Sequence, residues 1–435
     1  MNFNFNPTSC INFPNDWKKY KFYNLFTNVK DVSENYEIEI VFSLTKKGII
    51  EKDLQSNFGQ MASSYEKYTK VQKDDIVFNP MDLISGWVDL VPREGLVSPA
   101  YLTFRPNLSL INPDFAAFIF QSLYTNKMLF NFGKGVASHD GHGRWSISED
   151  VIMKSDIYIP ELNEQTKIVN QLKEKINNVN ILKSLTSQKT ELIHALQTSY
   201  IDNLICKMPN EAKEFKKSTL NWIEEIPITW KEKKLKHIGS FYNGLTGKNK
   251  ENFDKESNFN RKFINFKNVA SYLYVDQSNF GDVEIFNGEN QKTVLQNDLL
   301  FLMSSENYED IGKSSIQLEE LSDVYLNSFC KGFRLTDEEV DPHYLNFQLN
   351  STYLRDEISL EANGFTRINL RLENLENTKI LLPTLSEQKE IVKILREKYL
   401  TLKNLLNLIE QFSNLLEIYK KSLIQNSIRK PVSRN

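Results

Sequence analysis

A few polar residues have types and spacings that could support chemistry in this 435-residue chain. His139 and His142 could approach one metal ion, but no cysteine or third histidine lies near them in the sequence, which disfavours a zinc site. The glycines of Gly133-Lys-Gly135 and Gly141-His-Gly143 neither follow the phosphate-loop pattern nor open a strand–helix dinucleotide unit. We interpret these glycines as turns, or as a loop that a ligand could order.

Nuclease and methyltransferase signatures are incomplete. Glu211-Ala-Lys213 and Glu232-Lys-Lys234 end in a pattern that many nucleases share, but no Pro-Asp partner stands at a convincing distance upstream. Asn79-Pro80-Met81 lacks the second proline and the aromatic residue of an amino-methyltransferase motif, and nothing resembles a glycine-rich S-adenosylmethionine loop. The sequence therefore favours a binding protein that lacks catalytic activity.

Composition narrows the class of protein. Hydrophobic residues make up 40% and charged residues 25% of the chain, as in folded globular proteins. The net charge is -3, so charge alone does not predict nucleic-acid binding, and we interpret the lysine cluster at 231–236 and the basic tail at 420–435 as solvated faces. No run approaches the ~18 apolar residues of a membrane span. With three widely spaced cysteines and no signal-peptide pattern, we expect a cytoplasmic protein without membrane contact.

The chain contains a long-period internal repeat. Pro160-Glu-Leu162-Asn-Glu164-Gln165 returns as Pro383-Thr-Leu385-Ser-Glu387-Gln388, a shift of 223 residues (383 minus 160). The same shift relates Arg144 to Arg367, and Asp75-Ile-Val-Phe78 to Asp298-Leu-Leu-Phe301. Pro14-Asn-Asp-Trp17 and Pro227-Ile-Thr-Trp230 open the two halves at a shift of 213. The chain is therefore a tandem duplication of one unit, with repeats far longer than those of a solenoid.

Each repeat divides into a strand-rich part and a helical part. Short apolar runs such as 75–78 and 298–302 predict strands, so each first part is a mixed α/β globule. Helices are predicted at 163–205 and 386–428, with Asn163 and Ser386 as N-caps. The predicted fold is therefore α+β: two α/β globules joined by two long helices. The predicted segments are 1–160 and 211–383 for the globules, 161–210 for the central helix, and 384–435 for the C-terminal helix with its basic tail.

Apolar residues of the second helix follow a coiled-coil spacing, and those of the first follow it more loosely. Steps of 3 and 4 connect Leu402, Leu405, Ile409, Phe412, Leu416, Tyr419 and Leu423. Each helix is ~65 Å long at 1.5 Å per residue and must bury this stripe on a partner. We expect the two helices to pair antiparallel as a coiled coil, with a pseudo-two-fold relation between the repeats. Partner-binding and spacer residues are predicted at the helix starts and along this seam: Leu162, Glu164, Gln165, Leu385, Glu387, Gln388, Leu405, Ile409, Phe412 and Leu416.

This combination resembles the specificity (S) subunit of type I restriction–modification enzymes. The repeated Pro-x-Leu-x-Glu-Gln motif, the Pro-x-x-Trp motif and the run Ala362-Asn-Gly364-Phe-Thr-Arg367 carry the resemblance, which covers about residues 13–428. The first repeat departs at Gly141-His-Gly-Arg144, where only the arginine is kept. The resemblance implies that each globule is a target-recognition domain for one half of a bipartite DNA sequence.

The resemblance also implies partners and cofactors. One copy of the chain would bind double-stranded DNA and dock two methyltransferase (M) subunits, and restriction (R) subunits would complete the enzyme. S-adenosylmethionine, ATP and Mg would belong to the partner subunits, with no cofactor or metal on this chain. Two readers on one face of B-DNA lie about one turn, ~34 Å, apart, so the helix pair would set a fixed unspecified spacer. We then expect insertion of one heptad into either helix to change the spacer length and to leave the two specific blocks unchanged.

Individual DNA contacts follow less directly from the sequence. Basic side chains in polar, Gly-rich or Asn-rich stretches are the candidates: Lys134, Arg144, Lys248, Lys250 and Arg367. For the two repeated arginines a salt bridge to the helices is the structural alternative. Two other functions stay open. One is a coiled-coil scaffold with protein-binding heads, and the other is a cryptic nuclease or a degenerate methyltransferase.

Overall fold

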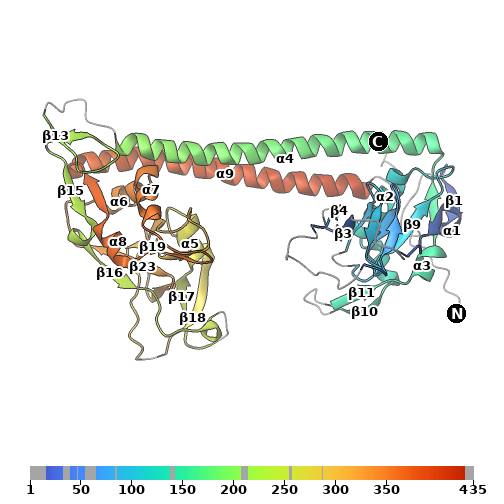
Figure 1. Ribbon diagram of the computed structural model, residues 1–435, viewed down its shortest axis with the longest axis horizontal. Helices are drawn as coiled ribbons and strands as arrows, with labels where there is room; N and C mark the ends of the chain where they lie inside the picture. Colours follow the sequence, from blue (N-terminus) through green and yellow to red (C-terminus); the bar gives the residue numbers. More distant parts are fainter. Residues whose placement is uncertain are drawn as a thin grey trace, which may run out of the picture. The chain divides into compact units, whose positions relative to one another are not determined.

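The chain folds into two compact units. The computed structural model describes residues 16–32, 40–46, 48–53, 65–83, 86–137, 143–206, 214–253, 257–286 and 288–426. The first unit combines Met1–Ser187 with Glu410–Asn435, and the second is Gln188–Ile409. Each unit contains a globular head, at 16–159 or 214–382, and a segment of each long helix (Figure 1). Each unit thus includes parts of both helices, whereas the sequence analysis assigned each helix to a segment of its own. The predicted segment boundaries stay a prediction.

The long helices α4 (Leu162–Ile205) and α9 (Leu385–Asn426) lie within one or two residues of their predicted bounds. The predicted N-cap Ser386 is wrong, because Thr384 caps α9. The Thr384 amide donates to Glu387 Oε2 at 2.8 Å, and the Glu387 amide donates weakly to Thr384 Oγ1 at 3.4 Å. This reciprocal pattern is a capping box, which satisfies backbone donors at the helix start. Helix α4 likewise begins at Leu162, ahead of the predicted cap Asn163.

The first head is a mixed α/β globule. Its main antiparallel sheet has the order β2 (Phe26–Asn28), β9 (Leu102–Pro106), β6 (Ile76–Phe78) and β7 (Val88–Leu90). A second sheet has the order β4 (Gly48–Glu51), β3 (Val41–Thr45), β8 (Gly95–Val97) and β5 (Thr69–Val71), with β3 and β8 parallel. Two strand pairs are β1 (Lys18–Lys21) with β12 (Asp156–Ile159) and β10 (Lys134–Ala137) with β11 (Gly143–Ser146). Helices are α1 (Phe22–Leu25), α2 (Pro113–Thr125), the 3-10 helix η1 (Met128–Phe132) and α3 (Glu149–Met153).

The second head repeats this plan. Its main antiparallel sheet has the order β16 (Gly239–Asn243), β23 (Cys330–Leu335), β19 (Leu299–Leu302) and β21 (Ser314–Ile316). A smaller sheet has the order β18 (Phe280–Glu284), β17 (Asn260–Ile264) and β22 (Val324–Leu326), with β17 and β22 parallel. Strand pairs are β15 (Lys231–Lys234) with β25 (Lys379–Leu382), β13 (Phe215–Lys217) with β14 (Glu225–Pro227), and β20 (Ser304–Ser305) with β24 (Ile368–Asn369). Helical elements are η2 (Leu235–His237), η3 (Lys250–Asn252), α5 (Phe266–Ser271), η4 (Gln277–Asn279), α6 (Pro342–Leu349), α7 (Thr352–Leu360) and α8 (Leu372–Asn377).

The duplication holds element by element. The main sheets have matching strand orders, and the parallel pair β3–β8 corresponds to β17–β22. Helices α2 and α6 each begin with a proline after an Asn or Asp cap, whose side chain accepts a hydrogen bond from the first turn. The runs predicted as strands at 75–78 and 298–302 contain β6 and β19, whose residues are all buried. The predicted fold class, with two α/β globules and two long helices, is confirmed.

Candidate nucleic-acid interface and partner-binding helices

The glutamine of the repeated Pro-x-Leu-x-Glu-Gln motif fastens each head to its long helix. In the first unit Gln165 is fully buried, and its Oε1 accepts a hydrogen bond from the backbone amide of Asn112 at 2.8 Å. Its Nε2 donates to the carbonyl oxygens of Leu110 and Pro160, at 3.0 and 2.9 Å. The side chain therefore connects the start of α4 to the start of α2.

Gln388 makes the equivalent bonds in the second unit. Its Oε1 accepts from the Asp341 amide at 2.8 Å, and its Nε2 donates to the carbonyl oxygens of Glu339 and Pro383, at 3.0 and 2.8 Å. Since buried amide groups need partners, these three bonds satisfy the glutamine side chain in both repeats. The glutamates beside them differ: Glu387 accepts from Trp230 Nε1 at 3.2 Å, whereas Glu164 is exposed and pairs with Lys167 at 3.5 Å. Of the other two predicted helix-start residues, Leu162 is exposed and Leu385 is half-buried.

A buried aspartate–arginine pair holds the main sheet of each head. Asp75 accepts two hydrogen bonds from Arg105 at 2.8 and 2.9 Å, and Asp298 accepts two from Arg334 at 2.9 and 2.6 Å. The two carboxylate side chains are 1% and 2% exposed. Each follows a residue with positive φ, Asp74 in one head and Asn297 in the other, types that tolerate this conformation. Both aspartates belong to the repeated motif found in the sequence, whereas their arginine partners were not predicted.

The candidate DNA contacts of the first head lie on its β10–β11 hairpin. Lys134 is exposed on β10, and Arg144 occupies β11 opposite Val136. The side chain of Arg144 lies outside the described part of the structure, as do His139 and His142. Trp145 stacks on Phe130 and donates from Nε1 to the Phe130 carbonyl at 2.7 Å, so packed aromatic rings support the hairpin. The predicted DNA contacts on this hairpin stay a prediction.

The three candidates of the second head have different surroundings. The ammonium group of Lys248 lies 2.7 Å from Glu289 and above the ring of Phe286, and its side chain is only 5% exposed. This pairing favours a structural role for Lys248. Lys250 is exposed at the start of η3. Arg367 is exposed and lies over the ring of Phe329 at 4.6 Å, and it forms no ion pair with a described residue. The alternative of a salt bridge from Arg367 to the helices therefore finds no support.

The runs that contain the two repeated arginines occupy equivalent places, although their sequences diverge. The Ile147 amide donates to the Pro80 carbonyl at 2.9 Å, and the Leu370 amide donates to the Met303 carbonyl at 3.0 Å. Both pairs of positions are related by the 223-residue shift of the repeat. Both runs therefore lie against the segment that follows the central strand of their main sheet, and backbone position is conserved where sequence is not.

The lysine cluster at 231–236 is largely engaged within the second head. Lys231 pairs with Glu339 at 2.7 Å, and Lys233 pairs with Asp337. The hydrogen bond from Lys233 is the largest cause that lowers the pKa of Asp337. Lys234 and Lys236 both donate to Asn377. The sequence predicted a solvated face, whereas these contacts give the cluster a structural role in the second head.

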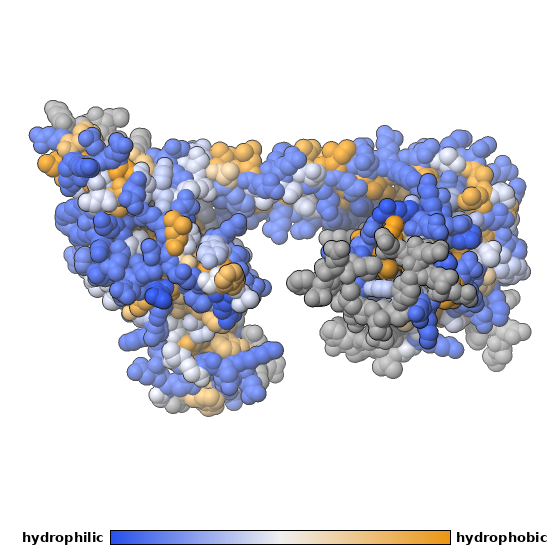
Figure 2. Space-filling view, viewed as in Figure 1, coloured by the Kyte–Doolittle hydropathy of each residue, from blue (hydrophilic) through white to orange (hydrophobic). Residues whose placement is uncertain are grey.

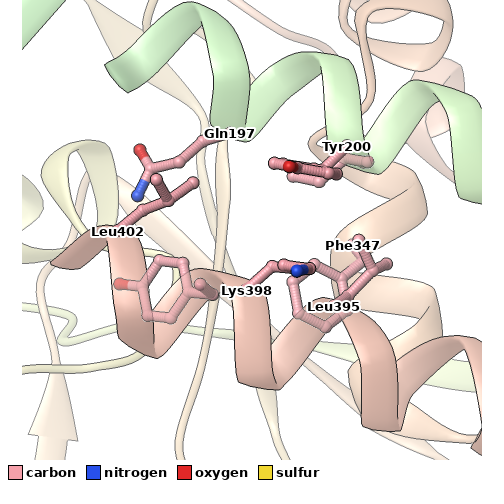
Figure 3. Close-up of a pocket in the computed structure, with 8 residues that line it drawn as sticks. Gln197, Tyr200, Phe347, Leu395, Lys398 and Leu402 are labelled. Atoms are coloured by element: carbon pink, nitrogen blue, oxygen red, sulfur yellow. The ribbon is translucent and has the colours of Figure 1, made fainter.

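The long helices run antiparallel within each unit. In the first unit Lys183 on α4 pairs with Glu417 on α9, and Lys420 on α9 donates to Asn180 on α4 at 3.2 Å. Between these two contacts the residue number falls by three on α4 and rises by three on α9, so the helices run in opposite directions. In the second unit Tyr200 from α4 and Lys398 from α9 meet beside a small pocket, with the ammonium 5.8 Å from the ring centroid (Figure 3). These contacts agree with the predicted antiparallel pairing.

The predicted coiled-coil seam is only half right. Leu416 is buried and Ile409 is half-buried, but Leu405 and Phe412 are exposed. The face of α9 that packs inward carries Leu395, Leu402, Leu406, Ile409, Ser413, Leu416 and Ile424, at steps of 7, 4, 3, 4, 3 and 8. Two helices alone cover only one side of a wide apolar stripe, so the other side stays in solvent.

A repeated apolar stripe results on the exposed side of the helices. The leucines of α4 that lie outside the packed face correspond, at a shift of 223, to apolar residues of α9 that are also outside it. The pairs are Leu182 with Leu405, Leu185 with Leu408, Leu192 with Leu415, and Leu196 with Tyr419, each between 41% and 61% exposed. Figure 2 shows apolar side chains at the surface of both helices. We call these eight residues the exposed stripe.

Metal sites and membrane spans have no support in the described part of the chain. Among the described residues, no group of three His, Cys, Asp or Glu side chains could hold a metal ion. Within the same residues, no helix is long and apolar enough to cross a membrane.

Comparison with known proteins supports one family. Residues 227–411 match the type I restriction modification DNA specificity domain. The type I restriction enzyme MjaVIII specificity subunit of Methanocaldococcus jannaschii is 22% identical over 402 residues, which cover 86% of each chain. A putative type I restriction enzyme MjaX specificity subunit of the same organism is 22% identical over 300 residues, which cover 68% of this chain and 63% of that protein.

Solved structures share the fold. A chain from a study of complex assembly and conformational transition of the type I R-M system superposes with a TM-score of 0.67 at 15% identity, covering 97% of this chain and 99% of that one. The HsdS subunit from Thermoanaerobacter tengcongensis has a TM-score of 0.50 at 15% identity, covering 98% of this chain and 100% of that one. Residues 227–411 therefore carry a type I restriction modification DNA specificity domain, and over most of its length the chain is similar to specificity subunits of type I restriction enzymes.

Proposed function

We propose that each head reads one half of a bipartite DNA target. The observation that carries this proposal is the contrast inside the repeat. The buried bonds of Gln165 and Asp75 return at Gln388 and Asp298, while the exposed basic and aromatic loops differ between the heads. Base-edge contacts give specificity and phosphate contacts give register, so two heads with one frame and different loops suit two different half-sites.

The helices would fix the spacing of the two half-sites. Both α4 and α9 contribute segments to both units, so each helix joins one head to the other. Readers on one face of B-DNA lie about one turn, ~34 Å, apart. We therefore propose two short specific blocks separated by a fixed run of unspecified bases.

The exposed stripe would dock partner subunits. Eight exposed apolar side chains at a repeated spacing form a surface that a partner helix could cover. Each Å² of apolar surface buried in this way would stabilise the complex by roughly 25 cal/mol. Because the stripe occurs once on α4 and once on α9, it offers two equivalent sites on a single copy of this chain. We propose that two methyltransferase subunits bind there and that restriction subunits join through them. S-adenosylmethionine, ATP and Mg would then belong to those partners.

The experiment that tests this function is single-molecule mapping of modified adenines. Cells that carry this gene with its neighbouring methyltransferase gene are compared with cells that lack this gene alone. We expect loss of one bipartite methylated motif, which reveals both half-sites and the spacer. An unchanged pattern of methylation, with both proteins expressed and the methyltransferase active, would contradict the proposal and favour a protein-binding scaffold.

A further inference from the structure

A short stack of side chains lies at the surface of the second head. The guanidinium of Arg367 lies over the ring of Phe329 at 4.6 Å, and Phe329 meets the ring of Phe266 edge-on at 6.4 Å. All three side chains are exposed by more than a third. They come from three separate segments of the chain. Phe266 is the first residue of α5, Phe329 immediately precedes β23, and Arg367 immediately precedes β24. The stack is therefore built by the tertiary fold.

Phe365 lies two residues before Arg367, in a loop that is closed at its base. The backbones of Asn363 and Asn369 exchange two hydrogen bonds, at 3.0 and 2.9 Å, which close the loop at its base. Gly364 has a φ of 145°, and a Cβ there would lie 2.0 Å from the Arg367 carbonyl oxygen, so the turn requires glycine. The hydroxyl of Tyr308 donates to the Gly364 carbonyl at 3.2 Å. The loop is held in place, yet the Phe365 side chain is 103% exposed.

The segment that carries Tyr308 is itself fixed by a second side chain. Arg355 on α7 is largely buried, and its guanidinium donates to the carbonyl oxygens of Glu309 and Ile311. Those carbonyls lie on the segment that also carries Tyr308. The anchoring is polar and internal, whereas the aromatic tip makes no contribution to the core. The Phe365 side chain is therefore held at the surface, where it is free to contact another molecule.

We propose that Phe365 inserts against the bases of the half-site that the second head reads, with Arg367 on the adjacent phosphate or base edge. This inference rests on the proposed function, because it takes duplex DNA as the ligand. An apolar side chain next to an arginine is the combination that proteins use to wedge between base steps while the cation contacts the backbone. Glu306 and Glu309 make the neighbouring surface mixed in charge, so stacking by Phe365, more than phosphate attraction, carries the binding.

The test uses the complex of the full chain with its methyltransferase partner and duplexes that carry the mapped target. Equilibrium binding is measured at several salt concentrations for the wild type, Phe365→Ala, Phe365→Trp, Arg367→Gln and the control Leu360→Ala. Leu360 is an 84% exposed apolar residue on α7 that lies outside the stack. Duplexes with 2-aminopurine at successive positions of the half-site report unstacking of each base step.

Phe365→Ala should weaken binding about tenfold at every salt concentration and abolish the 2-aminopurine signal at one step, since stacking does not release counterions. Phe365→Trp should keep both. Arg367→Gln should lower the salt slope by about 0.9 if it loses a phosphate contact. Leu360→Ala should behave as wild type.

Three results would overturn the inference. If Phe365→Ala matches Leu360→Ala while the wild type binds its target, the wedge is wrong and the proposed function stands. If Phe365→Ala lowers binding of the methyltransferase subunit and leaves DNA binding by the assembled complex intact, the loop is a protein contact. If the wild-type complex shows no preference for any mapped duplex, the proposed function itself fails.

Discussion

The two heads are alike in their buried polar contacts and unlike at their surfaces. Gln165 and Gln388 make the same set of hydrogen bonds, and Asp75 and Asp298 each hold one arginine. At the surface, the first head presents the β10–β11 hairpin, whereas the second presents the Phe365 loop. Duplication has therefore preserved what a head needs to fold and to join its helix.

The contrast separates two kinds of arginine. Arg105 and Arg334 are structural, because a buried carboxylate orients each of them. Arg367 faces solvent over an aromatic ring and has no ion pair with a described residue. An exposed cation without a partner is free to contact DNA, while a paired one is committed to the fold.

The largest expected effect is loss of the buried carboxylate. Asp75→Ala and Asp298→Ala should each lower the free energy of unfolding of their own head by about 3 kcal/mol. This loss is at the low end of that for a fully buried ion pair, because the two arginines are partly exposed. The second head should lose slightly more, since Tyr242 also donates to Asp298 at 2.8 Å. Urea unfolding with hydrogen exchange of each head measures this effect.

A surface pair provides the control for that change. Asp282→Ala removes a partly exposed carboxylate that pairs with Lys262 at 2.9 Å, and it should cost less than about 1 kcal/mol. Equal losses for Asp282→Ala and Asp298→Ala would show that the buried pair has no special role in the frame.

The next effect concerns the joint between head and helix. Gln165→Ala and Gln388→Ala each remove three hydrogen bonds and leave backbone groups unpaired, which should cost about 2 kcal/mol in either unit. Hydrogen exchange in the first turns of α4 and α9 should rise equally. Gln171→Ala, at an exposed position on α4, is the control. A response in only one unit would break the equivalence of the two joints.

A third prediction compares the part of the exposed stripe on α4 with the part on α9. Leu185→Lys and Leu408→Lys place a charge at equivalent exposed positions, so the fold should persist while each variant loses one of two methyltransferase subunits. Native mass spectrometry should show two partners on the wild type and one on each variant, with Gln411→Lys as an exposed polar control. Two partners on both variants would exclude the stripe as the docking surface.

The smallest effect is a pH dependence confined to the second head. Burial is the main cause that lowers the pKa of His343. The charge of Arg396 lowers this pKa further, whereas the charge of Asp341 raises it. The His343 ring lies beside the ring of Tyr274. Because the folded pKa lies below the unfolded value of about 6.5, the unfolded chain binds more protons as the pH falls through that range, and stability decreases. His343→Gln should reduce the loss that the second head suffers between pH 7 and 5.5, as measured by thermal unfolding. An unchanged pH profile would contradict this assignment.

The duplication made much of the fold predictable. The paired motifs located both long helices, and the apolar runs at 76–78 and 299–302 located the central strands. The seam was predicted less well because α9 is apolar on two adjacent faces, and a heptad pattern does not reveal which face the partner helix covers. The cap at Thr384 was missed because Ser386 is also a good N-cap by type.

The candidate site was harder to predict because its contacts are long-range. Lys248 is paired with Glu289 and is 5% exposed, although its polar sequence surroundings indicated a surface residue. The contact of Arg367 with Phe329 joins residues that precede two different strands, and no local pattern indicates it. Exposure of Phe365 likewise depends on the closed loop and not on its residue type, which usually predicts burial.

The most direct test of the central claim exchanges one head. Residues 231–382 are replaced by the corresponding segment of a related specificity subunit, and modified adenines are mapped in cells that contain the proposed methyltransferase partner. If each head reads its own half-site, one block of the target changes while the other block and the spacer length are kept. A change in both blocks, or a target that is not bipartite, would contradict the account.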